Sequence, residues 1–249
     1  MLKEERHNII LEEIRAKNKV HSADLSQQLN VSEDTIRRDL RELSENGHLK
    51  KVHGGAMANP HVPDHIRSPE FTHRAERIII AKKATAFVQD HQVLILEGDA
   101  TSELLVEQLP SDLRATIFTN SPAIAMKLFR FHSVETFLLG GKISHRACKS
   151  QGLEVINTLK DIHADLCIFS ALSIHGDIGI MDEDREYAIT LKTMMQSASR
   201  SIALCLSNHI GRIKPFKVES ITNINTLITE IDASDDSLEN IRSKGVDIQ

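Results

Sequence analysis

Three arginines, Arg37, Arg38 and Arg41, stand close together in the stretch SEDTIRRDLRELSENGHLKKVHGGA, residues 32–56. A guanidinium can engage phosphate oxygens, and its planar fork also matches the O6 and N7 edge of guanine. At about 100° per residue on a helix, Arg38 and Arg41 project from one side, with Arg37 flanking them. The apolar residues of the same helix share the opposite side: Ile36, Leu40 and Leu43. This spacing leaves the arginine side of the helix available to a partner such as a nucleic acid.

Other residues near these arginines fit the same chemistry. Backbone N–H groups at the start of the helix, from Ser32 to Thr35, can approach a phosphate. Ser22 is expected to cap a preceding short helix, and Ser32 to cap the arginine-bearing one. Three further residues on a strand-like segment could lie along a phosphate backbone as a wing: Lys50, Lys51 and His53.

A second interpretation of the arginines stays open from periodicity alone. They could pair with acids on a solvated helix, where ion pairs mean little for function. Residues 1–57 contain equal numbers of basic and acidic residues, and the whole chain has a net charge of -5. Composition therefore does not decide between these two interpretations, and the geometry of the helix must.

The elements around these residues divide the 249-residue chain into two parts. Helical spacing at residues 3–17, 22–29 and 32–46, followed by a small strand or hairpin, predicts a helix-turn-helix with a wing. A proline-rich stretch without periodicity predicts a linker. Short apolar strands then alternate with helices, which indicates a mostly parallel α/β sheet covered on both faces. The expected domains are residues 1–57, a linker at residues 58–73, and residues 74–249.

Polar loops of the second part could hold a small molecule. A loop between the carboxyl end of a strand and a helix N-terminus can cradle an anion, so Asn120 and Ser121 suit a phosphate or a sugar hydroxyl. Lys192 could supply a positive charge, and Gly141 belongs to a paired glycine after a strand. Each of these also has a structural interpretation, as a helix cap, a surface lysine or a tight turn.

The arginine stretch resembles the signature of the DeoR family of bacterial transcription regulators. The shared features are an S-x-x-T-[IV]-R-R-D-[LI] helix and a closing H-G-G-A. The resemblance implies a winged helix-turn-helix over roughly residues 3–58, and a double-stranded DNA operator as its partner. Three later stretches, FTNSPAIA, LLGG and TLKTMM, resemble the sensor domain of the family, which is similar in fold to ribose-phosphate isomerases. That resemblance implies a sugar phosphate or related metabolite as effector.

Two loops depart from the family pattern. The family commonly carries a phosphate-binding D-x-G-[TS]-T loop, whereas this chain reads EGDATS, with Asp99 in place of a glycine and Ala100 in place of a hydroxyl residue. The family's D-S-S-K-F-G appears as LSNHIG, which loses the acid and the lysine. A carboxylate is expected to repel a phosphate. We therefore expect either a different ligand, such as an uncharged sugar or one with a cationic group that Glu97 and Asp99 could meet, or a site that mainly serves dimerisation. The candidate effector residues are Glu97, Gly98, Asp99, Ala100, Thr101, Ser102, Asn120, Ser121, Gly141, Lys192, Asn208 and His209.

The function expected from the sequence is that of a regulator, and more narrowly a repressor, of a carbohydrate-related operon, controlled by a small ligand. We expect a cytoplasmic homo-oligomer without a membrane segment or a cofactor. His145 and Cys148 form half a metal site at most, so no metal is expected, and MDEDREY at residues 181–187 is expected to be a solvated loop. The alternative is an isomerase or deaminase that acts on a sugar phosphate and carries an added helical domain.

Overall fold

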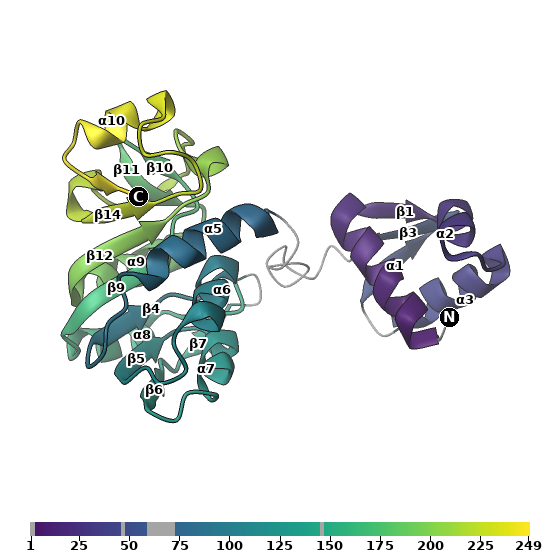
Figure 1. The fold of residues 1–249 in the computed structure, drawn as a ribbon, viewed down its shortest axis with the longest axis horizontal. Coiled ribbons are helices and arrows are strands. Elements are labelled where there is room, and N and C mark those ends of the chain that lie inside the picture. Colours follow the sequence, from purple (N-terminus) through teal and green to yellow (C-terminus); the bar gives the residue numbers. More distant parts are fainter. Residues whose placement is uncertain (1–2, 46–47, 59–72, 145–146) are drawn as a thin grey trace. The chain divides into compact units, whose positions relative to one another are not determined.

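The computed structural model describes residues 3–45, 48–58, 73–144 and 147–249. Internal contacts divide the chain into two compact units, Met1–Thr72 and His73–Gln249, which are treated separately below (Figure 1). Most of the expected linker at residues 58–73 lies outside the described residues, as does His145.

The smaller unit is a winged helix-turn-helix. Its three strands pair antiparallel in the order β1-β3-β2. The three helices fall where periodicity predicts them, whereas the first strand is too short for any period to reveal it. The elements are α1 (Lys3–Lys17), β1 (Lys19–His21), α2 (Ser22–Leu29), α3 (Glu33–Glu45), β2 (Leu49–Val52) and β3 (Gly55–Ala58).

One apolar core fixes the three helices of this unit against one another. Ile10 of α1, Leu25 of α2, and Ile36 and Leu40 of α3 are all at most 1% exposed. Burying a side chain of this size contributes about 1.5–3 kcal/mol. The apolar side of α3 is thereby held inward, and its charged side faces solvent.

The paired glycine closes the wing for two different reasons. Gly54 has a φ of 76°, a left-handed conformation that side chains rarely adopt. A Cβ on Gly55 would lie 2.0 Å from the backbone oxygen of Val20, because β3 packs tightly beside β1. Gly54 allows the left-handed backbone conformation of the turn, and Gly55 allows the close approach of β3 to β1.

The larger unit is built on a seven-stranded sheet of order β15-β14-β12-β9-β4-β5-β6, and every pairing in it is parallel. This confirms the predicted α/β architecture. Its strands are β4 (Val93–Leu96), β5 (Ala115–Thr119), β6 (Val134–Leu138), β9 (Ala164–Ser170), β12 (Ala198–Leu204), β14 (Thr226–Ile228) and β15 (Asp247–Ile248). Its helices are α5 (Arg74–Thr85), α6 (Ala100–Gln108), α7 (Pro122–Leu128), α8 (Leu153–Lys160), α9 (Arg185–Gln196) and α10 (Glu239–Arg242).

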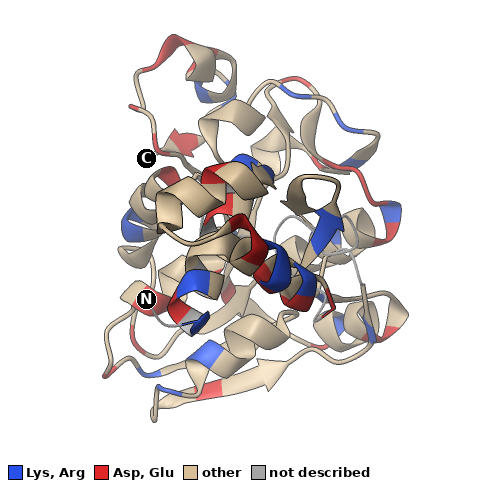
Figure 2. Cartoon of the chain, turned by 90° about the vertical axis from the view of Figure 1, so that its right-hand side faces the viewer, with Lys and Arg blue, Asp and Glu red and all other residues tan. Residues whose placement is uncertain are grey.

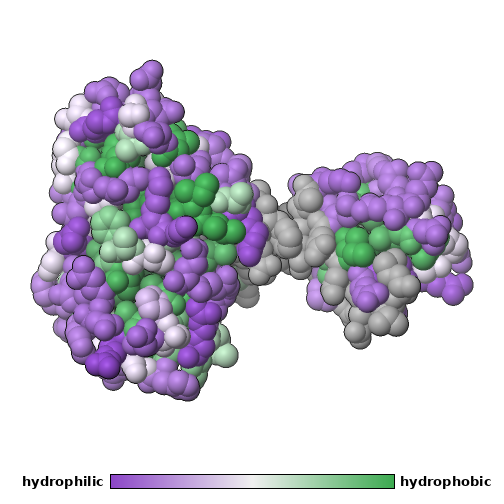
Figure 3. All heavy atoms as spheres, in the orientation of Figure 1, coloured by the Kyte–Doolittle hydropathy of each residue, from purple (hydrophilic) through white to green (hydrophobic). Residues whose placement is uncertain are grey.

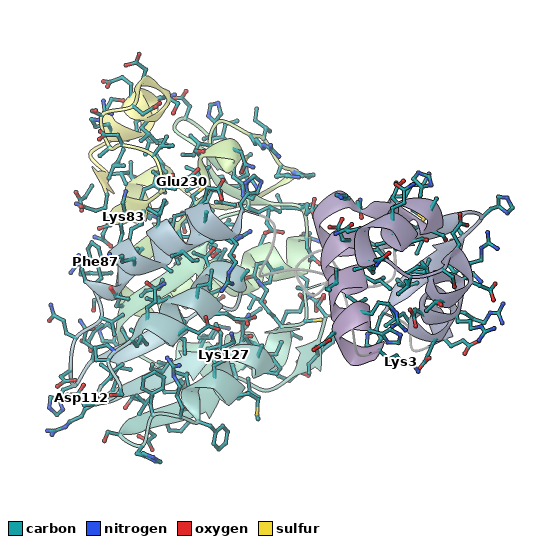
Figure 4. The ribbon with its side chains drawn as sticks, turned by 45° about the vertical axis from the view of Figure 1, so that its right-hand side comes forward. Lys3, Lys83, Phe87, Asp112, Lys127 and Glu230 are labelled. Atoms are coloured by element: carbon teal, nitrogen blue, oxygen red, sulfur yellow. The ribbon has the colours of Figure 1, made fainter. Side chains whose placement is uncertain are left out.

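Helices cover both faces of this sheet, and each face has its own core. One core contains buried residues of α5, α6 and α7, and the other contains buried residues of α8, α9 and α10. Polar contacts add to the packing of the first layer. Lys83 of α5 donates to the backbone oxygen of Thr229, and Lys127 of α7 pairs with two acids of α6, Glu103 and Glu107 (Figure 4).

Short antiparallel strands complete the larger unit and were not predicted. They are β7 (Lys142–Ile143) with β8 (Ser150–Gln151), and β10 (Ile174–His175) with β11 (Gly179–Asp182) and β13 (Phe216–Glu219). Three single turns of 3-10 helix also occur, at Ser207–His209, Ile221–Asn223 and Asp236–Leu238. The solvated loop expected at residues 181–187 is wrong, because Met181 and Asp182 are buried in β11 and Tyr187 is buried in α9.

The surface is mixed in character. Basic and acidic residues are interspersed along the chain (Figure 2), and hydrophobic residues form separate patches on the visible face of the larger unit (Figure 3). Among the described helices, none is long and apolar enough to cross a membrane.

Candidate DNA-binding surface and ligand site

The turn before α3 is fixed by local hydrogen bonds. Asn30 adopts a left-handed conformation at the end of α2, and its N–H donates to the last carbonyl groups of that helix. The N–H of Val31 then donates to the oxygen of Ser26 at 3.2 Å, while the Ser26 hydroxyl donates back to the oxygen of Val31 at 2.7 Å. This reciprocal pair sets the angle at which α3 leaves α2.

The two expected helix caps have different outcomes. Ser32 caps α3 as predicted, because its Oγ accepts the N–H of Thr35 at 3.2 Å and also contacts the Thr35 hydroxyl. The prediction for Ser22 is wrong: the N-cap of α2 is His21, and Ser22 is the first helical residue. Ser22 is buried, and its N–H donates to the oxygen of Gly54 in the wing. It therefore links α2 to the hairpin.

A buried carboxylate on α3 ties this helix to α1. Asp39 is 3% exposed and accepts hydrogen bonds from Arg6, at 2.5 and 3.0 Å, and from His7 at 3.1 Å. Burial alone would raise the pKa of the Asp39 carboxyl, but its bonds to Arg6 and His7 outweigh burial and hold the pKa below its usual range. Sequence reasoning missed this role, although an acid on the apolar side of a helix was the signal for it.

The arginines of α3 lie on the exposed side, as the spacing predicts. Arg37 pairs with Glu33 at 2.8 Å and Arg38 with Asp34 at 3.3 Å, and the Arg38 side chain is 80% exposed. Such exposed pairs one turn apart contribute only about 0.3–0.5 kcal/mol. The ion pairs of the solvated-helix interpretation are therefore present for two arginines, yet they are weak enough for phosphate contacts to replace them.

The basic residues of the wing are also exposed. Lys50 and Lys51 lie on β2 and His53 in the turn after it. Neighbouring residues of a strand point to opposite faces, so the two lysines do not share a face. β2 is an edge strand of its sheet, and both lysine side chains are exposed.

In the larger unit, Glu97 lies at the point where the order of successive strands in the sheet reverses. After β4 the chain continues through β5 and β6 on one side, and from β9 through β12, β14 and β15 on the other. Ligands of open α/β sheets bind at the carboxyl ends of strands at such a switch point. Glu97 follows β4 directly, and its Oε2 accepts the N–H of Ser170, the last residue of β9, at 3.0 Å.

Two residues that the sequence did not reveal bind the Glu97 carboxylate. Lys149 and the hydroxyl of Tyr187 both hydrogen-bond its Oε1. Lys149 also lies 4.5 Å from the centre of the Tyr187 ring. Burial, followed by the charge of Glu97, raises the pKa of Tyr187 well above its usual value, so the hydroxyl stays protonated and donates. We refer to Glu97, Lys149 and Tyr187 as the Glu97 cluster.

The carboxylate of Asp99 occupies the N-terminus of α6. Its Oδ1 accepts the N–H groups of Thr101 and Ser102, both at 2.9 Å. Its Oδ2 lies 3.0 Å from Nη1 of Arg77, which also donates to the Thr101 hydroxyl at 2.6 Å. Burial alone would raise the pKa of the Asp99 carboxyl, but the charge of Arg77 leads the opposing effects that hold the pKa below its usual range. Sequence reasoning missed Arg77, which lies in α5.

The second expected loop packs against the first. The side-chain oxygen of Asn120 accepts the N–H of Gly98 at 3.2 Å, and its amide donates to the oxygen of Ser150. Ser121 caps α7 by accepting the N–H of Ile124. A Cβ on Gly98 would lie 2.1 Å from Cβ of Ser121, so only glycine allows the two loops to approach. Ala100, Thr101 and Ser102 are buried in the first turn of α6.

The remaining expected effector residues lie apart from the Glu97 cluster or differ in charge from the expectation. Lys192 is exposed and pairs with Glu219 of β13 at 3.4 Å. The lysine beside Glu97 is Lys149 and not Lys192. Asn208 contacts His73 at 3.1 Å. Burial, together with nearby Arg212 and other cationic groups, lowers the pKa of His209, so the protonated form expected to bind a phosphate is disfavoured at neutral pH.

Two other features complete the description of this unit. Gly141 has a φ of 135° just before β7, which suits the expected turn. Among the described residues, no group of three or more His, Cys, Asp and Glu side chains is placed to hold a metal ion.

Family comparisons match both units. The DeoR-like helix-turn-helix domain matches residues 6–62, and the DeoR C terminal sensor domain matches residues 72–231. The chain belongs to the DeoR family. This DeoR-family chain is thus a DNA-binding transcription regulator, as the arginine stretch predicts.

Curated relatives cover nearly the whole DeoR-family chain. The HTH-type transcriptional regulator GolR of Listeria innocua is 32% identical over 236 residues, covering 91% of this chain and 90% of the relative. The L-fucose operon activator of Escherichia coli is 28% identical, covering 83% and 86%. The HTH-type transcriptional repressor GlcR of Bacillus subtilis is 29% identical, covering 92% and 89%.

A solved structure resembles part of the fold. Ribose 5-phosphate isomerase A of Methanocaldococcus jannaschii aligns with a TM-score of 0.42 at 13% identity, covering 56% of this chain and 55% of that one.

Proposed function

We propose that this chain represses a carbohydrate-related operon and that a small ligand in the larger unit changes its affinity for operator DNA. The observation that carries the proposal is the geometry of α3, whose arginines face solvent while Asp39 and the apolar residues fix the helix from behind. The names of relatives support a sugar operon, since one is an L-fucose operon activator. Within this proposal residues 1–57 bind DNA, residues 58–73 link the domains and residues 74–249 sense the ligand.

In this proposal the second helix of the motif enters the major groove. Arg37, Arg38 and Arg41 contact base edges and phosphates, and Ser32 and Thr35 orient the start of α3. The wing adds phosphate contacts, and Ser22 holds the wing against α2. The wing residues concerned are Lys50, Lys51 and His53.

The ligand site of this proposal lies at the switch point of the sheet, around Glu97, Asp99 and Asn120. The support is the convergence of a buried carboxylate, a lysine and two capped helix N-termini at the carboxyl ends of β4, β5 and β9. One reader helix spans only a few base pairs, so we propose a homo-oligomer that presents two of them. Such a protein works where the chromosome lies, which supports a cytoplasmic location.

A DNA selection tests this function. Genomic fragments retained by the full chain would be sequenced, and fluorescence anisotropy would then measure binding to the fragment with the highest enrichment. We expect the Arg38→Ala/Arg41→Ala double variant to lose sequence preference and at least tenfold in affinity, since one base-contacting arginine contributes about 1–3 kcal/mol. Lys17→Ala, which removes an exposed positive charge from α1, is the matched control. Equal binding by the double variant and the control would contradict the proposal.

We propose no catalytic activity for the larger unit. An isomerase base must be free to take a proton from its substrate. Glu97 is instead engaged by Lys149, by Tyr187 and by the N–H of Ser170. Turnover of sugar phosphates by the purified chain, lost in Glu97→Gln, would favour the isomerase or deaminase alternative.

A further inference from the structure

The α6 N-terminus already holds an anion that belongs to the chain. A helix N-terminus attracts a phosphate because its first N–H groups are free and its dipole is positive. Here Asp99 accepts two of those N–H groups, from Thr101 and Ser102, and Arg77 neutralises it at 3.0 Å. The donors that would bind a phosphate at this loop are therefore engaged.

The charge balance of the loop also opposes a phosphate. Asp99 is ionised at neutral pH, because Arg77 and the N–H groups stabilise its charged form. Its side chain is only 18% exposed, so water screens it poorly. Glu97 adds a second carboxylate one residue before Gly98, and Lys149 is paired with it. A phosphate placed here would meet like charge at short range.

Three buried side-chain oxygen atoms lack a hydrogen-bond partner within the described part of the chain, at Gln151, Ser102 and Ser170. Two of them are Oε1 of Gln151 and Oγ of Ser102, in residues that are 3% and 0% exposed. The Gln151 amide is oriented by its Nε2, which donates to Glu186 at 2.8 Å, so its free oxygen can only accept. Gln151 follows Lys149, which binds Glu97, by two residues, and its partner Glu186 directly precedes Tyr187 in α9.

The unpaired oxygen of Gln151 requires a hydrogen-bond donor from a ligand. A buried acceptor without a donor costs free energy, and a ligand that supplies a donor removes that cost. A hydroxyl group can donate to Gln151, whereas a phosphate dianion offers only acceptors. The filled anion position disfavours a phosphate, and the free acceptor favours a ligand that carries a hydroxyl group.

We propose that the ligand presents hydroxyl groups, and no phosphate, to the α6 N-terminus, and that Asp99 sets this preference. The ligand class is a neutral polyhydroxyl compound such as a sugar or sugar alcohol. This inference rests on the proposed function, since it specifies the ligand of the same site. Asp99 acts as a specificity-determining residue by occupying the place of an anion.

Calorimetric titration of the full chain with inorganic phosphate tests the role of Asp99. We expect Asp99→Gly to bind phosphate at least tenfold more tightly than the unmodified chain, because it frees two N–H groups and removes the carboxylate that neutralises Arg77. Asp235→Gly is the matched control, since it removes the same charge from another side-chain cap of the larger unit. Tight phosphate binding by the unmodified chain, or no gain in Asp99→Gly beyond that of Asp235→Gly, would overturn the inference.

Thermal unfolding would show whether Asp99→Gly folds. If it does not, a second variant tests the same inference. Asp99→Asn keeps a cap oxygen and loses the charge, so its phosphate affinity should lie between those of the unmodified chain and Asp99→Gly. No gain over the unmodified chain would count against the inference. These titrations contain no DNA, so a chain that fails to bind an operator would reject the proposed function without changing their outcome.

Discussion

Each arginine of α3 has its own electrostatic surroundings. Arg37 and Arg38 each have an acid one turn earlier, whereas Arg41 has no ion-pair partner within the described residues. On binding DNA, the two paired arginines must exchange a carboxylate for a phosphate, and the freed acids then lie near the nucleic acid. Glu33 and Asp34 therefore moderate the affinity that the arginines provide.

This arrangement predicts a gain of affinity from the loss of an acid. Glu33→Gln should tighten binding to duplex DNA by about 0.5 kcal/mol or more, because it frees Arg37 and removes a charge that repels phosphates. Glu45→Gln, at the other end of α3, controls for net charge. Anisotropy titrations at low salt would measure both, and weaker binding by Glu33→Gln would show that this acid contacts a base or orients Arg37.

Asp99 makes the stability of the larger unit depend on pH. Its pKa is lower when folded than the value of about 3.9 in an unfolded chain, so its contribution is present above that pH and is lost as the pH falls through the folded value. Asp99→Asn should be less stable at pH 7 by roughly 0.5–2 kcal/mol, and the gap should narrow as the pH falls below about 4.

Urea unfolding of the larger unit at several pH values would measure that gap. Asp112→Asn, which removes an exposed carboxylate (Figure 4), should change stability by less than about 0.5 kcal/mol. A gap for Asp99→Asn that is independent of pH would assign the effect to cap geometry and not to charge.

At the scale of elements, the wing depends on two glycines in different ways. Gly55→Ala places a Cβ 2.0 Å from the backbone oxygen of Val20, so β3 must separate from β1. Gly54→Ala meets no atom within 4 Å and only strains the backbone, at a cost of roughly 1–2 kcal/mol. Urea unfolding of residues 1–72 within the full chain should show a larger loss of stability for Gly55→Ala. Equal losses would mean that the hairpin shifts to admit the methyl group.

Elements with a clear period and short apolar runs between helices could be predicted from sequence, whereas short strands with few apolar residues could not. Helices such as α3 and α9 repeat apolar residues over several turns, which fixes both their existence and their buried side. Strands such as β1 (Lys19–His21) and β8 (Ser150–Gln151) contain neither a repeat nor an apolar run to detect. Lys149 just precedes β8, which is why the lysine at Glu97 was missed and Lys192 was named for its place.

Site residues that depend on local contacts could be predicted, and those that depend on distant partners could not. Ser32 and the outward arginines depend on contacts within one helix, so local spacing was sufficient to place them. Arg77 and Asp39 depend on partners 22 and 33 residues away. Periodicity gives no information on which distant residue meets such a side chain, and only the packed structure supplies it.

At the scale of the whole molecule, a single winged unit offers one reader helix to the groove. Two copies should therefore bind two half-sites, separated by about one helical turn of DNA or a multiple of it. Footprinting on a selected operator should show two symmetric protected segments, and sedimentation should show the matching oligomer. Moving one half-site by five base pairs should cost at least tenfold in affinity. A single asymmetric footprint with a monomer bound would contradict this.

Because the Asp99 carboxylate occupies the α6 N-terminus and pairs with Arg77, the free protein needs no dissolved anion at that position. If the ligand is the neutral polyhydroxyl compound proposed above, the sensor detects a nutrient before any kinase has acted on it. Under that proposal, the response requires no phosphorylated form of the nutrient.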